Sequence, residues 1–204
     1  LSYAAILSLY DRLGDKIFSA IEKSFSNFAT TRAHFQEKLE RLEKRMSVLK
    51  LFDYIRNGKV TQKGKFAMNI YGYELPVTEL YIRDLFKRLN YQETCAVLCA
   101  ICHESKKGQW GATIKSRNFR RVESFVERVV GEIIAAEETA EIEDITKEPD
   151  FRLARAIVEW ANGCRFDDLS KWTSCDSGDI IRTFRLVIQV VRNLLDVTQD
   201  DQKF

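Results

Sequence analysis

Apolar residues recur every three or four positions along most of this chain, which is the spacing of an α-helix that buries one face. Nine glycines and two prolines among 204 residues provide few turn signals, and this scarcity favours long helices over a strand-rich fold. The predicted helices cover, in chain order, residues 2–13, 17–28, 33–49, 61–70, 76–89, a cysteine-bearing segment around 95–102, 122–136, 150–161, 167–172 and a long final segment after 176.

One short stretch departs from the helical pattern. Asn57 and Gly58 lie between two β-prone runs, which is the signal of a tight hairpin, and Thr61 can then cap the next helix. We therefore expect an all-α fold, a multi-helix bundle with at most one small β-hairpin. The hydrophobic share of 45% is sufficient for the core of one large domain or two small ones.

Charge and composition narrow the possible partners. Charged residues make up 30% of the chain but the net charge is only +2, so a nucleic acid would have to bind a local patch. No apolar run of about 18 residues predicts a membrane helix, and the first residues lack the basic flank of a secretory signal. Five cysteines, an odd number, indicate free thiols in a reducing compartment and a cytoplasmic location. Because the first residue is not Met, we interpret the chain as a fragment.

Three cysteines and a histidine lie in the string TCAVLCAICHES, which contains a Cys-x-x-Cys-His motif. Such a motif can bind zinc or haem. Zinc needs about four converging ligands, however, and Cys164 and Cys175 are eleven residues apart instead of forming a second pair. Haem attachment is typical of exported proteins. The cysteines share the apolar side of the predicted helix, where cysteine behaves as a small hydrophobic residue. We therefore predict core thiols, with no metal and no cofactor in this chain.

A basic segment, KKGQWGATIKSRNFRR, runs from Lys106 to Arg121 with six Lys or Arg residues and no acid. We predict that it is a loop. Cationic side chains beside an aromatic ring suit an RNA backbone and a stacked base. The candidate nucleic-acid contacts in this segment are Trp110, Lys115, Arg117, Arg120 and Arg121. A solvated loop without a partner would explain the same residues, and this alternative stays open.

The final helix has two predicted faces. The buried face comprises Ile180, Ile181, Phe184, Val187, Ile188, Val191, Leu194 and Leu195. The opposite face comprises the polar residues Arg182, Arg185, Gln189 and Asn193, spaced three or four apart. Guanidinium groups at this spacing can bind phosphates or stack on bases, although an ordinary solvated face has the same pattern. With the short helix predicted over 167–172, the segment also has the outline of a helix-turn-helix.

The order of several segments resembles a known family. LSYAAILSLY and IEKSFSNF resemble the chain that leaves a helicase winged helix. VTQKGKFAMNIYGYELPVTEL resembles a T-x-K-G-x-x-A…E-L-x-x-T-E-L signature, and WANGCRFDDLSKWTSCDSGDIIRTFR resembles a W-x-x-G-x-x-F…T…G-D-x-x-R-x-x-R signature. The chain thereby resembles the DSHCT domain, the C-terminal helical domain of Ski/HelY-type DExH-box RNA helicases. Only the charged helix of residues 33–50 stands where exosome-linked members insert an arch, so the resemblance is to the compact, arch-free form.

The resemblance implies a domain organisation and site residues. Residues 1–50 correspond to helices that leave an upstream winged helix, and residues 51–204 to the helical, or ratchet, domain. In the family this domain closes a ring around single-stranded RNA, and its last helix lines the path of the strand. Arg182 and Arg185 match the family's R-x-x-R. Leu186 and Gln189 stand where some members have a basic residue and a Glu.

The implied function is therefore the RNA-guiding domain of an ATP-dependent RNA helicase. The expected partners are single-stranded RNA, or DNA, and the helicase's own RecA-like motor domains, which would hold ATP and Mg; no membrane is expected. Two other functions stay open from the residues alone. One is a DNA-binding regulator that uses the helix-turn-helix outline, and the other is a helical protein-interaction module.

We predict that this chain alone does not hydrolyse ATP. The stretch from Gly58 to Gly64-Lys65 has five intervening residues instead of the four of a phosphate-binding loop, and Phe66 replaces the Ser or Thr that would hold magnesium. ATPase assays with and without single-stranded RNA should give no turnover above background. Turnover that co-purifies with the chain through several chromatographic steps would contradict this expectation.

Overall fold

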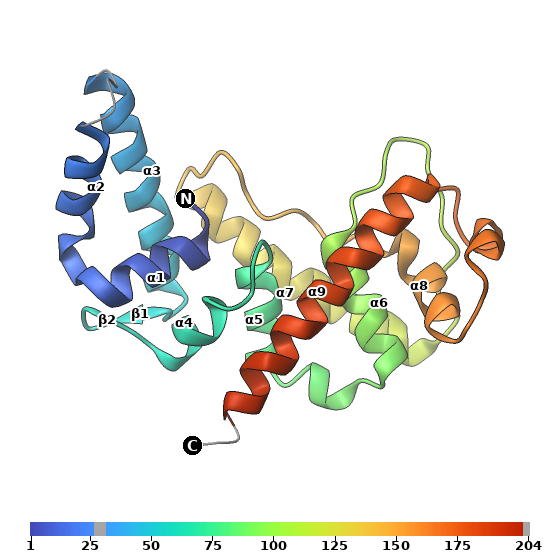
Figure 1. Ribbon diagram of the computed structural model, residues 1–204. Helices are drawn as coiled ribbons and strands as arrows, with labels where there is room; N and C mark the ends of the chain where they lie inside the picture. Colours follow the sequence, from blue (N-terminus) through green and yellow to red (C-terminus); the bar gives the residue numbers. More distant parts are fainter. Residues whose placement is uncertain (27–31, 202–204) are drawn as a thin grey trace.

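The computed structural model describes residues 1–26 and 32–201 (Figure 1). In these residues the elements are almost all helical, which confirms the predicted all-α class. The α-helices are α1 (Tyr3–Leu13), α2 (Ile17–Ser26), α3 (Arg32–Leu51), α4 (Gln62–Ala67), α5 (Glu74–Ile82), α6 (Tyr91–Cys102), α7 (Arg117–Thr139), α8 (Ala154–Ala161) and α9 (Ser177–Asp201). Four 3-10 helices are η1 (Gly14–Lys16), η2 (Phe86–Arg88), η3 (Phe151–Leu153) and η4 (Phe166–Lys171). In the described part of the chain, no helix is long and apolar enough to cross a membrane.

The predicted hairpin is present. Strands β1 (Ile55–Arg56) and β2 (Lys59–Val60) pair antiparallel, with Ile55 opposite Val60. The two turn residues, Asn57 and Gly58, have φ angles of 52° and 72°. Positive φ at both central positions is the requirement of a type I′ turn, and asparagine followed by glycine meets it with the least strain.

Some predicted boundaries are wrong, and local backbone geometry gives the reasons. The helix expected over 76–89 ends at Ile82, because Asp84 adopts a φ of 56° and the chain continues as η2. The helix expected over 150–161 begins with the 3-10 helix η3, and the helix expected over 167–172 is the 3-10 helix η4. The helix expected over 17–28 is present as α2 to Ser26, and its last two predicted residues lie outside the described ones.

The helices form two connected parts. At one end α2 and α3 form an antiparallel pair beside α1, while α6, α8 and α9 gather at the other end, and α7 runs behind both (Figure 1). The core around α1 and α3 also takes residues from beyond position 50, including Tyr54, Ala67 and Ile133. The segment 1–50 thus shares its core with the rest of the chain, and its assignment to an upstream part of the protein stays a prediction.

Helix α6 is the central helix of the second part. One side of it, with Leu98, Cys99 and Cys102, packs in a core with α8 and α9. Its other side, with Ala96 and Val97, packs in a core with α7. Cys99 and Cys102 are buried and Cys95 is half-buried, and all are free thiols, which confirms the predicted core role of these cysteines.

A buried carboxylate joins the hairpin region to α4 and α5. Glu79 is 3% exposed, and its Oε1 lies 2.5 Å from Lys63 Nζ and accepts a hydrogen bond of 2.9 Å from the Tyr54 hydroxyl. A buried charge is tolerated when it is paired and hydrogen-bonded in this way. Burial and the Glu79 carboxylate raise the pKa of Tyr54. In the same region, the Thr61 hydroxyl caps α4 by accepting the Gly64 N–H at 3.1 Å.

We predict that Gly64→Ala destabilises the fold while Gly131→Ala does not. A Cβ at Gly64 would lie 2.5 Å from the Tyr54 carbonyl oxygen, whereas a Cβ at Gly131 in α7 would meet no atom within 4 Å. Overpacking at Gly64 should lower the free energy of unfolding by about 1–3 kcal/mol. Gly131→Ala should raise it by up to about 1 kcal/mol through helix propensity. Urea titrations of the two variants measure both values, and equal stabilities would refute the close approach at Gly64.

Candidate nucleic-acid interface

Helix α9 is anchored through one face. Ile180, Phe184, Val187 and Val190 are at most 4% exposed and follow the helical spacing of three or four residues. They lie in one core with residues of α6 and α8. The ring of Trp160, in α8, lies 5.0 Å from the Phe184 ring, centroid to centroid. The anchor therefore runs along the first half of the helix.

The predicted division of α9 into faces is partly wrong. Ile181, Ile188 and Leu195, predicted to be buried, are 47%, 37% and 53% exposed. Asn193, predicted to face outward, is 7% exposed, and its Oδ1 accepts a hydrogen bond of 2.9 Å from Gln189 Nε2. The reason is that the described residues cover the helix from one side only, so the covered arc is narrower than the apolar arc and is centred on Phe184 and Val187.

The outward face of α9 carries arginines without partners. Arg182, Arg185 and Arg192 are exposed, and within the described residues none of their guanidinium groups forms a hydrogen bond or an ion pair. The nearest acid along the helix, Asp179, is already paired with Lys106 Nζ at 2.7 Å. A shallow groove runs along this face and is lined by Ile181, Arg182, Arg185, Ile188, Gln189 and Arg192, among others.

Aliphatic and cationic side chains alternate along this groove. Ile181, Arg185, Ile188 and Arg192 follow one another at spacings of three or four residues and so form a single stripe. Arg192 is not among the contacts predicted from the sequence. Its position seven residues after Arg185, two helical turns further along, is a signal that could have identified it.

The basic segment 106–121 is not one loop. Ser116 caps α7 by accepting the Phe119 N–H at 3.3 Å, so Arg117, Arg120 and Arg121 lie in the first turns of a helix. Only the part up to Lys115 is a loop, which corrects the prediction. The three arginines and Lys115 are exposed.

The loop is attached to the segment before α9. The Trp110 N–H donates to Ser174 Oγ at 2.8 Å, and the Ser174 N–H donates to the Trp110 carbonyl at 3.0 Å. Trp110 is 51% exposed. Gly111 and Thr173 form an isolated antiparallel β-bridge. Trp110 therefore lies near the start of α9.

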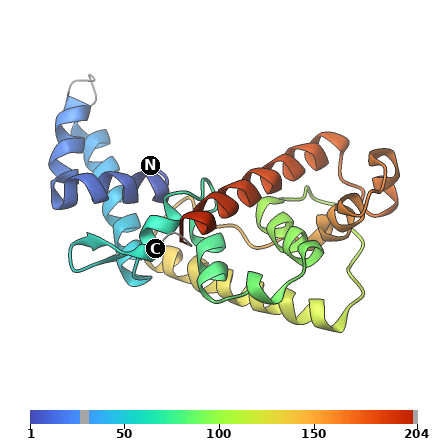
Figure 2. The same ribbon diagram turned by 60° about the horizontal axis from the view of Figure 1, so that its bottom comes forward.

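The two groups of basic candidates lie on different sides of the molecule. Helices α7 and α9 pack on opposite sides of α6, as Figure 2 shows with α9 along the top and α7 along the bottom. Trp110, Arg182, Arg185 and Gln189 belong to the α9 side. The loop continues to the start of α7, where Lys115, Arg117, Arg120 and Arg121 lie. Their role in binding nucleic acid stays a prediction.

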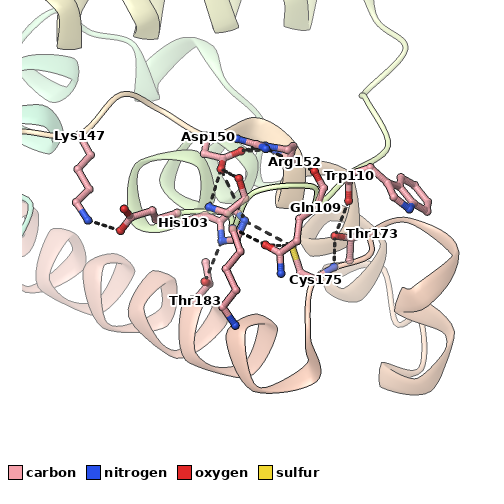
Figure 3. A network of polar contacts seen from close by, with 12 residues as sticks. His103, Gln109, Trp110, Lys147, Asp150, Arg152, Thr173, Cys175 and Thr183 are labelled. Carbon is pink, nitrogen blue, oxygen red and sulfur yellow. Dashed lines mark hydrogen bonds and ion pairs between the residues drawn. The ribbon is translucent and has the colours of Figure 1, made fainter.

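A buried polar network lies beneath the start of α9 (Figure 3). His103, at the end of α6, is 3% exposed; its Nδ1 lies 3.4 Å from Thr183 Oγ1 and its Nε2 3.6 Å from Cys175 Sγ. Burial lowers the pKa of His103. The histidine of the Cys-x-x-Cys-His motif thus contacts the α9 region instead of the cysteines of its own helix. The described residues contain no group of three or more His, Cys, Asp or Glu side chains arranged to hold a metal ion, and the metal-free state of the chain stays a prediction.

Asp150 extends this network to the segment before α8. Its Oδ2 accepts the Ser105 N–H at 2.9 Å and the Ser105 hydroxyl, and its Oδ1 accepts Arg152 Nε at 2.9 Å. Burial alone would raise the pKa of this carboxyl, but the hydrogen bonds from Ser105 and Arg152 lower it to about 2. The charged carboxylate therefore stabilises the frame that carries α9.

The geometry before α9 differs from a helix-turn-helix. The element expected as the first helix is the 3-10 helix η4, and the residues after it lie extended beside the loop through the Gly111–Thr173 bridge. A helix-turn-helix needs two α-helices joined by a tight turn. This segment therefore lacks the first helix and the turn of that motif.

Comparison with known proteins gives one family and several relatives. The family model of the DSHCT (NUC185) domain matches residues 57–203. Superkiller complex protein 2 of Mus musculus is 26% identical over 161 residues, which are 76% of this chain and 13% of that protein. Antiviral helicase SKI2 of Saccharomyces cerevisiae is 24% identical over 160 residues, 74% of this chain and 12% of that protein.

A further relative is Exosome RNA helicase MTR4 of Homo sapiens, which is 26% identical over 163 residues, 77% of this chain and 16% of that protein. The chain thus spans between 12% and 16% of the length of these relatives.

We predict that Asp150→Asn destabilises the fold in a pH-dependent way. The carboxyl has a pKa of about 2 in the folded chain and about 4 when unfolded, so its contribution of about 2 kcal/mol is complete above pH 4 and is lost as the pH falls through 2. Denaturant titrations at pH 7, 5 and 3 measure the free energy of unfolding of parent and variant. The difference between the two should be smallest at pH 3.

The matched control is Asp168→Asn. Its carboxylate is 43% exposed and pairs with Lys171 at 2.7 Å, so it should change the free energy of unfolding by less than about 1 kcal/mol. A constant difference between Asp150→Asn and the parent from pH 7 to pH 3 would contradict the role given to the Asp150 charge.

Proposed function

Because the chain belongs to the DSHCT (NUC185) domain family, we propose that it is the strand-guiding domain of an ATP-dependent RNA helicase. In this proposal the outward face of α9 contacts single-stranded RNA. The relatives named above include proteins described as an antiviral helicase and an exosome RNA helicase. The parent's motor domains are then a partner of this chain and hold ATP and Mg. A cytoplasmic location is part of the same proposal and fits the five free thiols.

The observation that carries the proposal is the charge pattern of α9. Residues 180–195 contain Arg182, Arg185 and Arg192 but no Asp or Glu. Many cations elsewhere in the described residues, such as Arg41, Lys63 and Arg83, pair with carboxylates. Unpaired guanidinium groups in a row are able to bind consecutive phosphates without first breaking an ion pair.

The aliphatic residues of the groove add a second kind of contact. Ile181 lies just before Arg182, and Ile188 lies between Arg185 and Arg192; both offer apolar surface to the faces of unstacked bases. From Arg182 to Arg192 the face is about 15 Å long, at 1.5 Å per residue, which corresponds to about four stacked nucleotides at 3.4 Å each. Contacts to phosphates and to base faces do not depend on the base sequence, as strand guiding requires.

Lys115, Arg117, Arg120 and Arg121 are proposed as a second, separate contact at the start of α7. A helical protein-interaction module is the alternative function, because the exposed Ile181, Ile188 and Leu195 could also bind a protein. Sequence-independent, salt-sensitive binding of a single strand distinguishes the two, since an apolar protein contact depends little on salt.

We predict that Arg182→Ala/Arg185→Ala weakens binding of a single-stranded oligouridylate. The salt slope of the affinity should fall by about 0.7 for each phosphate contact that is lost. The fold should survive because both side chains are exposed and such charges contribute at most about 1 kcal/mol to stability. Fluorescence anisotropy at several salt concentrations, with circular dichroism for the fold, measures these quantities. In the full-length helicase, unwinding should fall more than basal ATP hydrolysis.

The matched control is Arg12→Ala/Arg128→Ala, which removes the same charge from exposed positions on α1 and α7. It should leave the salt slope close to that of the parent. A folded α9 variant with unchanged RNA affinity and unwinding would refute the proposal. A preference for duplex DNA over the single strand would favour the DNA-binding regulator instead.

A further inference from the structure

A cavity of about 540 Å³ opens beside α9, and its wall is formed by this helix, the turn that joins α4 to α5, the end of α6 and part of the segment 144–149, among others. Its lining includes Tyr71 and Tyr73 from the turn and Arg182 and Leu186 from α9. Arg182 and Leu186 also line the groove of the outward face. The groove and the cavity therefore meet at these two residues. The volume is within the range of roughly 300–1,000 Å³ typical of small-molecule sites.

Tyr71 presents an open aromatic ring at this cavity. The residue is 68% exposed, and within the described residues its hydroxyl has no hydrogen-bond partner. The turn continues through Gly72 with a φ of 83°, a conformation that glycine adopts without strain. The next residue, Tyr73, is half-buried beside Cys102 and close to Arg182. The turn thus has one aromatic residue packed into the body and one left outside it.

The carboxylates around the cavity are already engaged. Glu137 accepts the Tyr3 hydroxyl at 2.8 Å and the Thr146 N–H at 2.5 Å, and Glu74 accepts the Ala4 N–H at 3.2 Å. Glu104 pairs with Lys147, and Asp144 lies 4.0 Å from Arg45. These contacts leave Arg182 as a cation without an ion pair in the described part of the chain.

We propose that Tyr71 is a stacking platform for one base of the bound strand. An open aromatic face and an unpaired guanidinium at one cavity match the two parts of a nucleotide, which are a base and a phosphate. A strand that leaves the α9 groove at Arg182 turns one base into the cavity, where the base stacks on the Tyr71 ring while its phosphate stays on Arg182. The inference rests on the proposed function and extends it by a base contact that lies outside α9.

Stacking on a tyrosine ring is tolerant of base identity, because every base has a π-face. The contact therefore requires that a base be present at one position of the strand, without selecting which base. It also makes no contribution to the salt dependence of binding, which belongs to the phosphate contacts. These two properties separate Tyr71 from the arginines experimentally.

The test compares Tyr71→Ala, Tyr71→Phe and Tyr91→Ala in the 204-residue chain. The probe is a fluorescent twelve-nucleotide oligouridylate. Tyr71→Ala should bind about tenfold more weakly, as expected for the loss of one stacked base, with an unchanged salt slope. Tyr71→Phe keeps the ring and should bind like the parent. Tyr91→Ala removes a comparably exposed tyrosine, 62% exposed at the start of α6, and should also bind like the parent.

A second measurement uses oligouridylates with a single abasic site moved along the strand. The parent should lose affinity at one position, and Tyr71→Ala should not. Photo-crosslinking of 4-thiouridine RNA to the unmodified chain should yield a Tyr71 peptide, which keeps the inference testable if Tyr71→Ala misfolds.

The outcomes distinguish this inference from the proposed function. Parent-like binding by Tyr71→Ala, with weaker binding by Arg182→Ala/Arg185→Ala, overturns the stacking platform and leaves the α9 interface in place. Equal losses in Tyr71→Ala and Tyr71→Phe assign the effect to the hydroxyl and likewise overturn stacking. Parent-like binding by both the tyrosine and the arginine variants overturns both proposals.

Discussion

The apolar packing of α9 against α6 is the contact on which the rest of the candidate interface depends. Ile180, Phe184, Val187 and Val190 are almost fully buried, and burial of one such side chain stabilises a fold by about 1.5–3 kcal/mol. A helix presents only one face to a neighbour, so anchoring these four residues leaves the remaining arc of α9 exposed. The same packing that holds the helix in place therefore presents its arginines to solvent.

Polar contacts fix the frame around that helix. Glu79, held by Lys63 and Tyr54, joins the hairpin region to α4 and α5. Asp150 joins the end of α6 to the segment before α8, and His103 reaches from there to Thr183 on α9. Many residues of the two family-like segments thus have structural roles, such as capping, close approach and buried pairing. Arg182, Arg185 and Arg192 differ from them because their guanidinium groups form no hydrogen bond or ion pair with the described residues.

The distribution of acids explains why the α9 arginines form no ion pair with the described residues. Asp176 and Asp179 lie at the start of α9, where negative charge is favoured by the helix dipole, and both pair with Lys106. Beyond Asp179 the helix has no acid until Asp196. The basic segment 106–121 is divided between two sides of α6. Its first part is held near the start of α9, while its last residues continue into α7 on the opposite side of α6.

The helical class, the hairpin and the core role of the cysteines could be predicted from the residues alone, because helical period, turn chemistry and capping are local properties. The same pattern predicted that Arg182 and Arg185 lie on the outward face of the final helix. Which part of the wide apolar arc of α9 is covered could not be predicted in this way, since it depends on the direction from which α6 approaches. For this reason Ile181 is exposed and Asn193 is buried, against expectation. The cavity between Tyr71 and α9 likewise exists only in the folded chain, because residues distant in sequence line it together.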